Sequence, residues 1–285
     1  MKLIRVGKSG NEVPGILLDN GKRIDVSGFG SDYNEEFFGG DGIELLGQWL
    51  KEHLSASPEF PDDERYGPPI CRPSKIVCIG LNYRDHAAES NMDIPEEPII
   101  FFKSSSSFCG PNDDVILPRN SKKTDWEVEL AIVIGKKASY VSKEDALNHV
   151  AGYALHNDYS EREFQLERGG QWVKGKSCDS FAPFGPFLAT PDQVKDINIL
   201  NMWLKVNGQV KQDANTSFMI FDIPHIISYL SQFMSLLPGD VISTGTPAGV
   251  GIGFDPPQFI SEGDVIELGI EGLGTSSQKA VNCSL

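Results

Sequence analysis

Short runs of apolar residues, each closed by Gly, Asn or Pro, dominate the chain from residue 75 onward. They are rich in β-branched residues, which is the composition of strands. The absence of regular helical crossovers between them indicates an α+β, mainly β fold and not a doubly wound sheet. The predicted strands are KIVCIG (75–80), IIFFK (99–103), DVILP (114–118), VELAIVIG (128–135), VAGYAL (150–155), LKVNGQVK (204–211), DVISTG (240–245) and DVIELGI (264–270).

Helical spacing of apolar residues predicts three helices. GIELLGQWLKEHL (42–54) has leucines and a tryptophan on one face. SKEDALNHV (142–150) opens with Ser142 followed by Asp145, which resembles a capping box. SFMIFDIPHIISYLSQFM (217–234) contains Pro224, a residue favoured in the first turn of a helix.

The first part of the chain has its own pattern of short strands, KLIRVG (2–7), VPGILLD (13–19) and KRIDVS (22–27), followed by the helix at 42–54. Residues 55–75 are rich in proline and charge, which is typical of a linker. We therefore predict a small N-terminal α/β domain at 1–70 and a larger domain at 71–285.

The formal net charge of −15 disfavours nucleic acid and anionic membrane surfaces as partners. An acidic small molecule could still bind, but it would need a metal ion and a few Lys or Arg side chains around it. The five cysteines form no CxxC pair, so we expect reduced thiols and a cytoplasmic protein. The start of the chain lacks the apolar core of a signal peptide.

Two acids open the predicted strand within DWEVELAIVIG (125–135). Residues two apart on a strand share a face, roughly 6.5–7 Å apart, so Glu127 and Glu129 crowd like charges, and Asp125 joins them if the strand already begins there. Asp158 follows another apolar run and completes an all-oxygen set suited to Mg²⁺, Mn²⁺ or Ca²⁺, with positions left open for water or substrate. A solvated strand edge explains the ExE spacing equally simply. For the neighbouring His156, a hydrogen-bonded structural role is the better interpretation.

Taken in order, several motifs resemble the fumarylacetoacetate hydrolase family. They are IVCIGLNYRDHAAE, PIIFFKSSSSFCGP, DWEVELAIVIGKKA, VAGYALHNDYSEREFQ, QWVKGKSCDSFAPFGP, NTSFMIFDIPHIISYLS and LLPGDVISTGTPAGVG. The resemblance covers roughly residues 74–285 and implies a mixed β-sandwich roll, with a small N-terminal α/β appendage. It further implies a homodimer that acts on small anionic 2-oxo or dioxo acids and uses Mg²⁺ or Mn²⁺, with Ca²⁺ able to take the site in crystals. The ion would be held by Glu127, Glu129 and Asp158.

The same resemblance assigns roles to other polar residues. His86 and Glu89, three apart and adjacent on a helical turn, become the pair that activates water, where HxxE alone is as well explained by an exposed contact. Lys176 becomes the stabiliser of an oxyanion, although most lysines are only solvated charges. The implied substrate-binding residues are Tyr83, Lys103, Arg162 and Gln165, with support of the pocket wall as the alternative for Lys103. In the loop STGTPAGVG, Thr246 is interpreted as a substrate contact, with a structural turn as the alternative. Glu163 and Cys178 depart from the family's usual residues.

Three functional hypotheses follow. The first is a metal-dependent hydrolase that cleaves a C–C bond in a 2,4-dioxo acid, with a diketo-deoxy sugar acid such as diketo-deoxy-fuconate or rhamnonate preferred. The second keeps the site but makes the enzyme a ureidoglycolate lyase, a 2-oxo acid (oxaloacetate) decarboxylase or a 2-hydroxyhepta-2,4-diene-1,7-dioate isomerase. The third is a non-enzymatic protein whose ion only braces the fold. It predicts a closed site, which convergence of His86, Arg162 and Lys176 on an open pocket would contradict.

Overall fold

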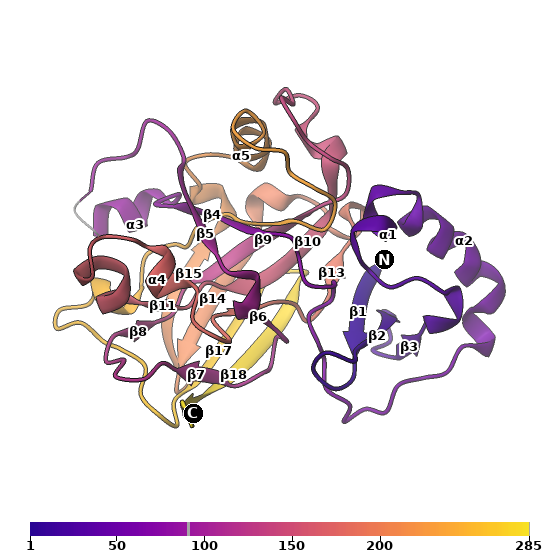
Figure 1. Cartoon of the computed structure of the whole chain (residues 1–285), viewed down its shortest axis with the longest axis horizontal. Helices are drawn as coiled ribbons and strands as arrows, with labels where there is room; N and C mark the ends of the chain where they lie inside the picture. The colour runs from indigo at the N-terminus through magenta and orange to yellow at the C-terminus, as the bar shows by residue number, and fades with distance from the viewer. Residues whose placement is uncertain (90–91, 285) are drawn as a thin grey trace.

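The computed structural model describes residues 1–89 and 92–284, and its largest element is a nine-stranded mixed sheet (Figure 1). The spatial order of the strands is β3-β2-β1-β13-β10-β9-β16-β4-β5. All neighbours are antiparallel except β16 and β4. The bounds are β1 (Lys2–Val6), β2 (Val13–Leu17), β3 (Arg23–Asp25), β4 (Ile76–Gly80), β5 (Ile99–Lys103), β9 (Val128–Ile134), β10 (Val150–Asn157), β13 (Leu188–Ala189) and β16 (Val241–Ser243).

The second sheet has five strands, and one segment in it differs from the prediction. The run at 204–211, expected as one strand, is the centre of a hairpin. Asn207 and Gly208 both have positive φ, 51° and 75°, as a tight two-residue hairpin turn requires. The strands, in spatial order, are β15 (Gln209–Asn215), β14 (Asn201–Val206), β17 (Val265–Ile270), β18 (Gly274–Asn282) and β7 (Val115–Leu117).

The main core lies between the two sheets. Val128, Leu130 and Ile132 of β9 are fully buried and belong to one apolar cluster with residues of β14 and β17. The alternate residues, among them Ala131, point to the opposite face, where a second cluster includes Phe37 of the N-terminal part. This alternation explains why Glu129 can lie on a strand whose other face is wholly apolar. The chain is mostly β, as the sequence predicts.

Two further strand pairs are short. One pair is β8 (Thr124–Asp125) with β11 (Ser160–Glu161), and the other is β6 (Phe108–Cys109) with β12 (Ala182–Pro183). The first pair continues the register of β9 and β10 beyond their ends, because Asp158 N donates to the Glu127 carbonyl (2.9 Å). It therefore holds the two chain segments that carry Glu127 and Asp158 side by side.

Helices are few and short: α1 (Glu35–Gly39), α2 (Gly42–His53), α3 (Arg84–Glu89), α4 (Val173–Lys176) and α5 (Ile223–Leu230). The predicted helices at 42–54 and around Pro224 are confirmed, and Asp222 caps the latter by accepting from His225 N (2.9 Å). The helix predicted at 142–150 is wrong. Asp145 N does donate to Ser142 Oγ (3.3 Å), but the segment makes only a 3-10 turn at Ala146–His149. Its backbone pairs instead with the end of β9, where Gly135 N donates to the His149 carbonyl (2.7 Å).

Residues 1–70 carry β1–β3, α1 and α2, which lie on the right of Figure 1. They join the larger part through backbone pairing, because Leu3 of β1 pairs with Leu188 of β13. The N-terminal strands thus extend the same sheet that carries the candidate site. The domain boundary at residue 70 stays a prediction.

All five cysteines are among the described residues, and each is a free thiol. Within the described ranges, no helix is both long and apolar enough to cross a membrane.

Candidate active site

Glu127, Glu129 and Asp158 converge as predicted. One carboxylate oxygen of each lies within 4.8 Å of those of the other two. Glu127 directly precedes β9, Glu129 lies on it, and Asp158 directly follows β10. The antiparallel register, in which Glu129 is opposite His156, brings Asp158 level with Glu127. The sequence spacing of two residues and the strand pairing therefore make the cluster together.

The electrostatics of these three acids fit a divalent cation. Burial, and then the negative charges of Asp158 and Glu127, raise the pKa of Glu129 well above its usual value. Burial acts in the same direction on Asp158, but the charges of Lys103 and Lys176 outweigh it and hold its pKa below the usual range. Three buried oxygen donors of which one resists ionisation match the hard ligand set of Mg²⁺ or Mn²⁺, since a bound cation would favour the ionised form.

Lys176, at the end of α4, contacts two of these three acids. Its Nζ lies 2.8 Å from Glu127 Oε2 and 3.0 Å from Asp158 Oδ2, and the side chain is almost completely buried. Lys103 is also buried and contacts Asp158 Oδ1 (2.5 Å) and the Tyr159 carbonyl (3.0 Å). Lys103 does not line the cavity, so the structure places it behind a metal-ligand candidate and not on the substrate side.

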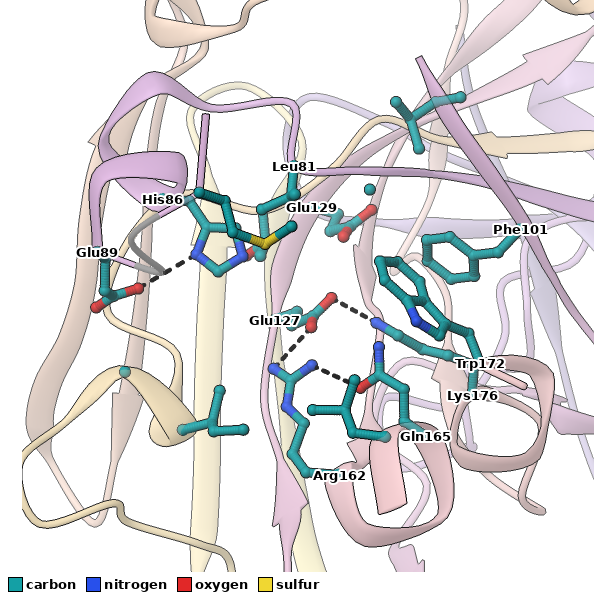
Figure 2. Close-up of a pocket in the computed structure, with 17 residues that line it drawn as sticks. Leu81, His86, Glu89, Phe101, Glu127, Glu129, Arg162, Gln165, Trp172 and Lys176 are labelled. Carbon is teal, nitrogen blue, oxygen red and sulfur yellow. Dashed lines mark hydrogen bonds and ion pairs between the residues drawn. The ribbon is translucent and has the colours of Figure 1, made fainter. Parts of the chain in front are cut away.

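Arg162 and Gln165 form a hydrogen-bonded pair beside Glu127 (Figure 2). Arg162 Nη1 donates to Gln165 Oε1 (3.0 Å), which turns the amide NH₂ of Gln165 away from the arginine. Arg162 Nε donates to Asp125 Oδ2 (2.7 Å). Its Nη2 lies 2.8 Å from Glu127 Oε1, at ion-pair distance, but has no aligned hydrogen-bond acceptor among the described residues. Asp125 thus belongs to the arginine and not to the three-acid cluster.

His86 and Glu89 of α3 line the same cavity as Glu127 and Glu129 and lie to one side of them (Figure 2). His86 Nδ1 is 3.2 Å from Glu89 Oε2. Glu89 is itself fixed by Gly249, whose N–H donates to Oε1 (3.0 Å). A carboxylate at Nδ1 selects the tautomer in which Nε2 is unprotonated, which is the form a general base needs.

Thr246 and Tyr83 are placed differently from each other. Thr246 lines the cavity, but its hydroxyl already donates to the Val128 carbonyl (2.9 Å) and accepts from Gln212 Nε2 (2.8 Å). Tyr83 is fully buried, its hydroxyl contacts Met202 Sδ (3.2 Å), and it does not line the cavity. The structure therefore places Tyr83 in the core between the sheets, which corrects its expected role in binding substrate.

These groups surround one cavity of about 360 Å³. It is lined by the expected site residues His86, Glu89, Glu127, Glu129, Arg162, Gln165, Lys176 and Thr246. The His86–Glu89 pair lies on one side of the cavity, and Glu127, Glu129 and Lys176 lie on another (Figure 2), whereas Asp158 is not among the residues that line it. The convergence of His86, Arg162 and Lys176 contradicts the hypothesis of a closed site that only braces the fold.

Two neutral groups that donate hydrogen bonds to Glu129 were not predicted from the sequence. Ser243 Oγ donates to Glu129 Oε2 (2.5 Å), and Gly245 N donates to the same oxygen (3.0 Å). His156 Nδ1 lies 2.6 Å from Ser243 Oγ, so His156 has the hydrogen-bonded structural role expected of it. Burial lowers the pKa of His156 to about 3, which keeps the ring neutral. The sequence signal that could have indicated the role of Ser243 is a serine at the end of a buried strand.

Comparisons with known proteins agree with this geometry. The profile of the family described as "Fumarylacetoacetate (FAA) hydrolase C-terminal" matches residues 75–281. The chain is 49% identical over 280 residues to a 2,4-didehydro-3-deoxy-L-rhamnonate hydrolase from Sphingomonas sp. (strain SKA58), covering 98% of this chain and 95% of that protein.

Solved structures give the same result. A fumarylacetoacetate hydrolase from Exiguobacterium antarcticum superposes with a TM-score of 0.86 at 35% identity, covering 99% of this chain and 100% of the other. A maleylpyruvate hydrolase from Sphingobium sp. SYK-6, solved in complex with manganese(II) ion and pyruvate, superposes with a TM-score of 0.83 at 30% identity and 99% coverage of both chains. The chain therefore belongs to the fumarylacetoacetate hydrolase family and is an enzyme of that family.

Proposed function

We propose that this enzyme is a divalent-metal-dependent hydrolase that cleaves a C–C bond in a 2,4-dioxo acid, preferably a 2,4-diketo-3-deoxy sugar acid. The observation that carries the proposal is the three-carboxylate cluster, of which Glu127 and Glu129 line one cavity together with the His86–Glu89 pair. The 49% identity to a 2,4-didehydro-3-deoxy-L-rhamnonate hydrolase supports the substrate class. The homodimer and the cytoplasmic location stay predictions.

Glu127, Glu129 and Asp158 would hold the ion, and Mg²⁺ and Mn²⁺ both fit their oxygen donors. The relative that was solved with manganese(II) and pyruvate supports Mn²⁺ as one ion that this type of site accepts. When bound, the ion supplies Lewis-acid polarisation of the substrate's 2-oxo group.

The chain's own residues provide the proton transfers. Nε2 of His86, with Nδ1–H held by Glu89, takes a proton from water, and the water oxygen adds to the C4 carbonyl. The C3–C4 bond then breaks, and its electron pair becomes the enolate of a three-carbon 2-oxo acid. The proton taken by His86 can return to C3 of that enolate. The products are pyruvate and the carboxylic acid that contains C4, so one water is consumed for each bond cleaved.

Lys176 and Gln165 would stabilise the oxyanion that forms at C4. Both line the cavity, and the hydrogen bond from Arg162 sets the orientation of the Gln165 amide. These preorganised donors act in a buried setting, where hydrogen bonds to developing charge are strongest.

The substrate panel that tests this function contains a 2,4-diketo-3-deoxy sugar acid, an unsubstituted 2,4-dioxo acid, oxaloacetate, ureidoglycolate and a 2-hydroxydienedioate. We expect one of the dioxo acids to be cleaved fastest, with release of pyruvate measured by a coupled assay. Chelation by EDTA should abolish turnover, and Mg²⁺ or Mn²⁺ should restore it. Glyoxylate and urea from ureidoglycolate as the fastest products, or isomerisation without cleavage, would defeat the proposal.

Replacing Ser243 by alanine should weaken metal binding by about 10- to 100-fold, the usual effect of removing a hydrogen bond to a metal ligand. Calorimetric titration of the metal-free protein with Mn²⁺ measures this directly. Thr244→Val is the matched control, because the buried hydroxyl of Thr244 donates only to the Leu130 carbonyl (2.9 Å). Equal affinities of the Ser243 variant and the wild type would show that Ser243 does not position Glu129.

A further inference from the structure

The strand β15 buries a polar residue and exposes an apolar one. Gln212 is 1% exposed, whereas Val210 on the same strand is 58% exposed. A β-bulge lies between these two residues, since the register with β14 shifts by one residue at Lys211. Bulges next to functional sites redirect side chains, and a buried amide is stable only when it is hydrogen-bonded. Gln212 is therefore buried for its hydrogen bonds and not for apolar contact.

The amide of Gln212 lies against the backbone of β9. Its Oε1 accepts from Val128 N (2.9 Å), and its Nε2 donates to Thr246 Oγ1 (2.8 Å) and to the Pro247 carbonyl (2.9 Å). The Thr246 hydroxyl in turn donates to the Val128 carbonyl (2.9 Å). Gln212 and Thr246 thus close a ring of hydrogen bonds on both backbone groups of Val128.

This ring takes the place of a neighbouring strand at the start of β9. The strand β16 ends at Ser243, and Thr244 N then donates to the Leu130 carbonyl (3.0 Å). The next residue, Gly245, has a φ of 98°, a left-handed conformation that turns the chain out of strand geometry. Val128 lies beyond this point on β9. Because buried backbone groups need partners, two side chains supply there what β16 supplies further along.

Val128 separates the two glutamates of the candidate metal site, so its position sets theirs. Glu127 and Glu129 share one face of the strand, and both are bonded directly to Val128. Glu127 N also donates to a buried amide, Asn157 Oδ1 (3.0 Å). Gln212 is not among the residues that line the cavity. Its amide therefore acts on the site through the backbone and not by contact with a substrate.

We propose that Gln212 is a positioning residue for the metal site: together with the Thr246 hydroxyl, its amide fixes β9 at Val128 and so sets the positions of the two flanking glutamates. This inference rests on the metal site of the proposed function. It gives the Thr246 hydroxyl a part in building the site, in place of the substrate contact expected from the sequence. Removing a group that orients metal ligands typically weakens metal binding by about 10- to 100-fold.

Calorimetric titration of metal-free variants with Mn²⁺ tests the proposal. Gln212→Met has a similar length but no hydrogen-bonding amide, and it should raise the Kd by about 10- to 100-fold. Thr246→Val should raise the Kd similarly, whereas Thr246→Ser keeps the hydroxyl and should bind Mn²⁺ as tightly as the wild type. The double variant Gln212→Met/Thr246→Val should bind about as weakly as the weaker single variant, because both changes break the same ring.

Thr216→Val is the matched control for a general loss of stability. Thr216 lies just after β15 and is buried, and its hydroxyl accepts from Leu200 N (2.9 Å) and donates to the Ile197 carbonyl (2.9 Å). This variant should lower the Tm of the metal-free protein and leave the Kd for Mn²⁺ unchanged. Hydrogen exchange adds a local readout, since the amide of Val128 should exchange faster in Gln212→Met than in Thr216→Val.

The outcomes separate this inference from the proposed function. If the wild type binds Mn²⁺ and the Kd of Gln212→Met is within about twofold of it, the inference is overturned and the proposed function stands. Effects that multiply in the double variant would also overturn it, because the two side chains would then act independently. If Gln212→Met does not fold, equal Kd values for Thr246→Val and Thr246→Ser overturn it. A wild type that does not bind Mn²⁺ would defeat both the inference and the metal site of the proposed function.

Discussion

Replacing Glu129 by glutamine should eliminate metal binding without destabilising the metal-free protein. The variant loses one of the three carboxylates that converge within 4.8 Å. Wild-type protein at a metal concentration about 100 times Kd should gain about 2.7 kcal/mol of stability from the ion, and the variant should gain none. Thermal unfolding with and without Mn²⁺ measures both quantities. A metal-induced rise in Tm that survives in the variant would contradict the assigned ligand set.

The stability of the metal-free protein should depend on pH, and the direction of this dependence follows from the pKa of Glu129. The pKa of Glu129 is raised by burial and by Asp158 and Glu127. Its contribution to stability is therefore complete below the pKa of an unfolded glutamate, about 4.3, and is lost as pH rises through the higher folded value. Glutamine cannot ionise, so the variant should match the wild type in acid and exceed it at neutral pH.

Asp158→Asn is the contrasting variant. The pKa of Asp158 is lowered by Lys103 and Lys176, so its contribution to stability is present above the unfolded value and is lost as pH falls through the folded one. Asparagine would leave two buried ammonium groups without this partner, at a cost of about 3–5 kcal/mol at neutral pH. Loss of metal binding with opposite effects on metal-free stability would distinguish the two acids.

Replacing His86 by glutamine should lower kcat by about 10²- to 10⁴-fold on the best substrate of the panel, because it removes the proposed general base. Metal affinity should not change, since the described part of the chain has no hydrogen bond or ion pair between His86 and the three acids. Steady-state kinetics and Mn²⁺ titration of the same preparation test both statements.

Glu89→Gln provides the graded control for the histidine. It keeps a side chain that can accept from Gly249 N and from the imidazole, but it removes the negative charge that favours the reactive tautomer. Its kcat should lie between those of the wild type and the His86 variant. Full activity of His86→Gln would remove His86 from the mechanism and leave the metal cluster unaffected.

The strand periodicity of two residues was sufficient to place Glu127 and Glu129 together. The position of Asp158 beside them depends on the register between β9 and β10, which a single sequence does not reveal. The resemblance to the family supplied that step. It also supplied His86 and Lys176, which approach the acids from α3 and α4, separated from them in sequence by long irregular segments.

Other features could not be obtained from the sequence for identifiable physical reasons. The hairpin at Asn207–Gly208 has a clear turn signal, which the apolar residues Leu204, Val206 and Val210 around it concealed. The segment after Ser142 has the cap of a helix, but tertiary pairing at His149 prevails over it. Tyr83 directly precedes α3 in sequence, but its ring lies in the core. That direction depends on packing alone.

The loop at 249–253 forms hydrogen bonds to two separate parts of the candidate site. Gly249 N–H holds Glu89, while the N–H groups of Gly251 (2.6 Å) and Ile252 (3.0 Å) bind Asp125, which also holds Arg162. Inserting or deleting a single residue in this loop would displace both Glu89, which contacts His86, and Asp125, which contacts Arg162. Redesign of this loop should therefore change its composition and keep its length.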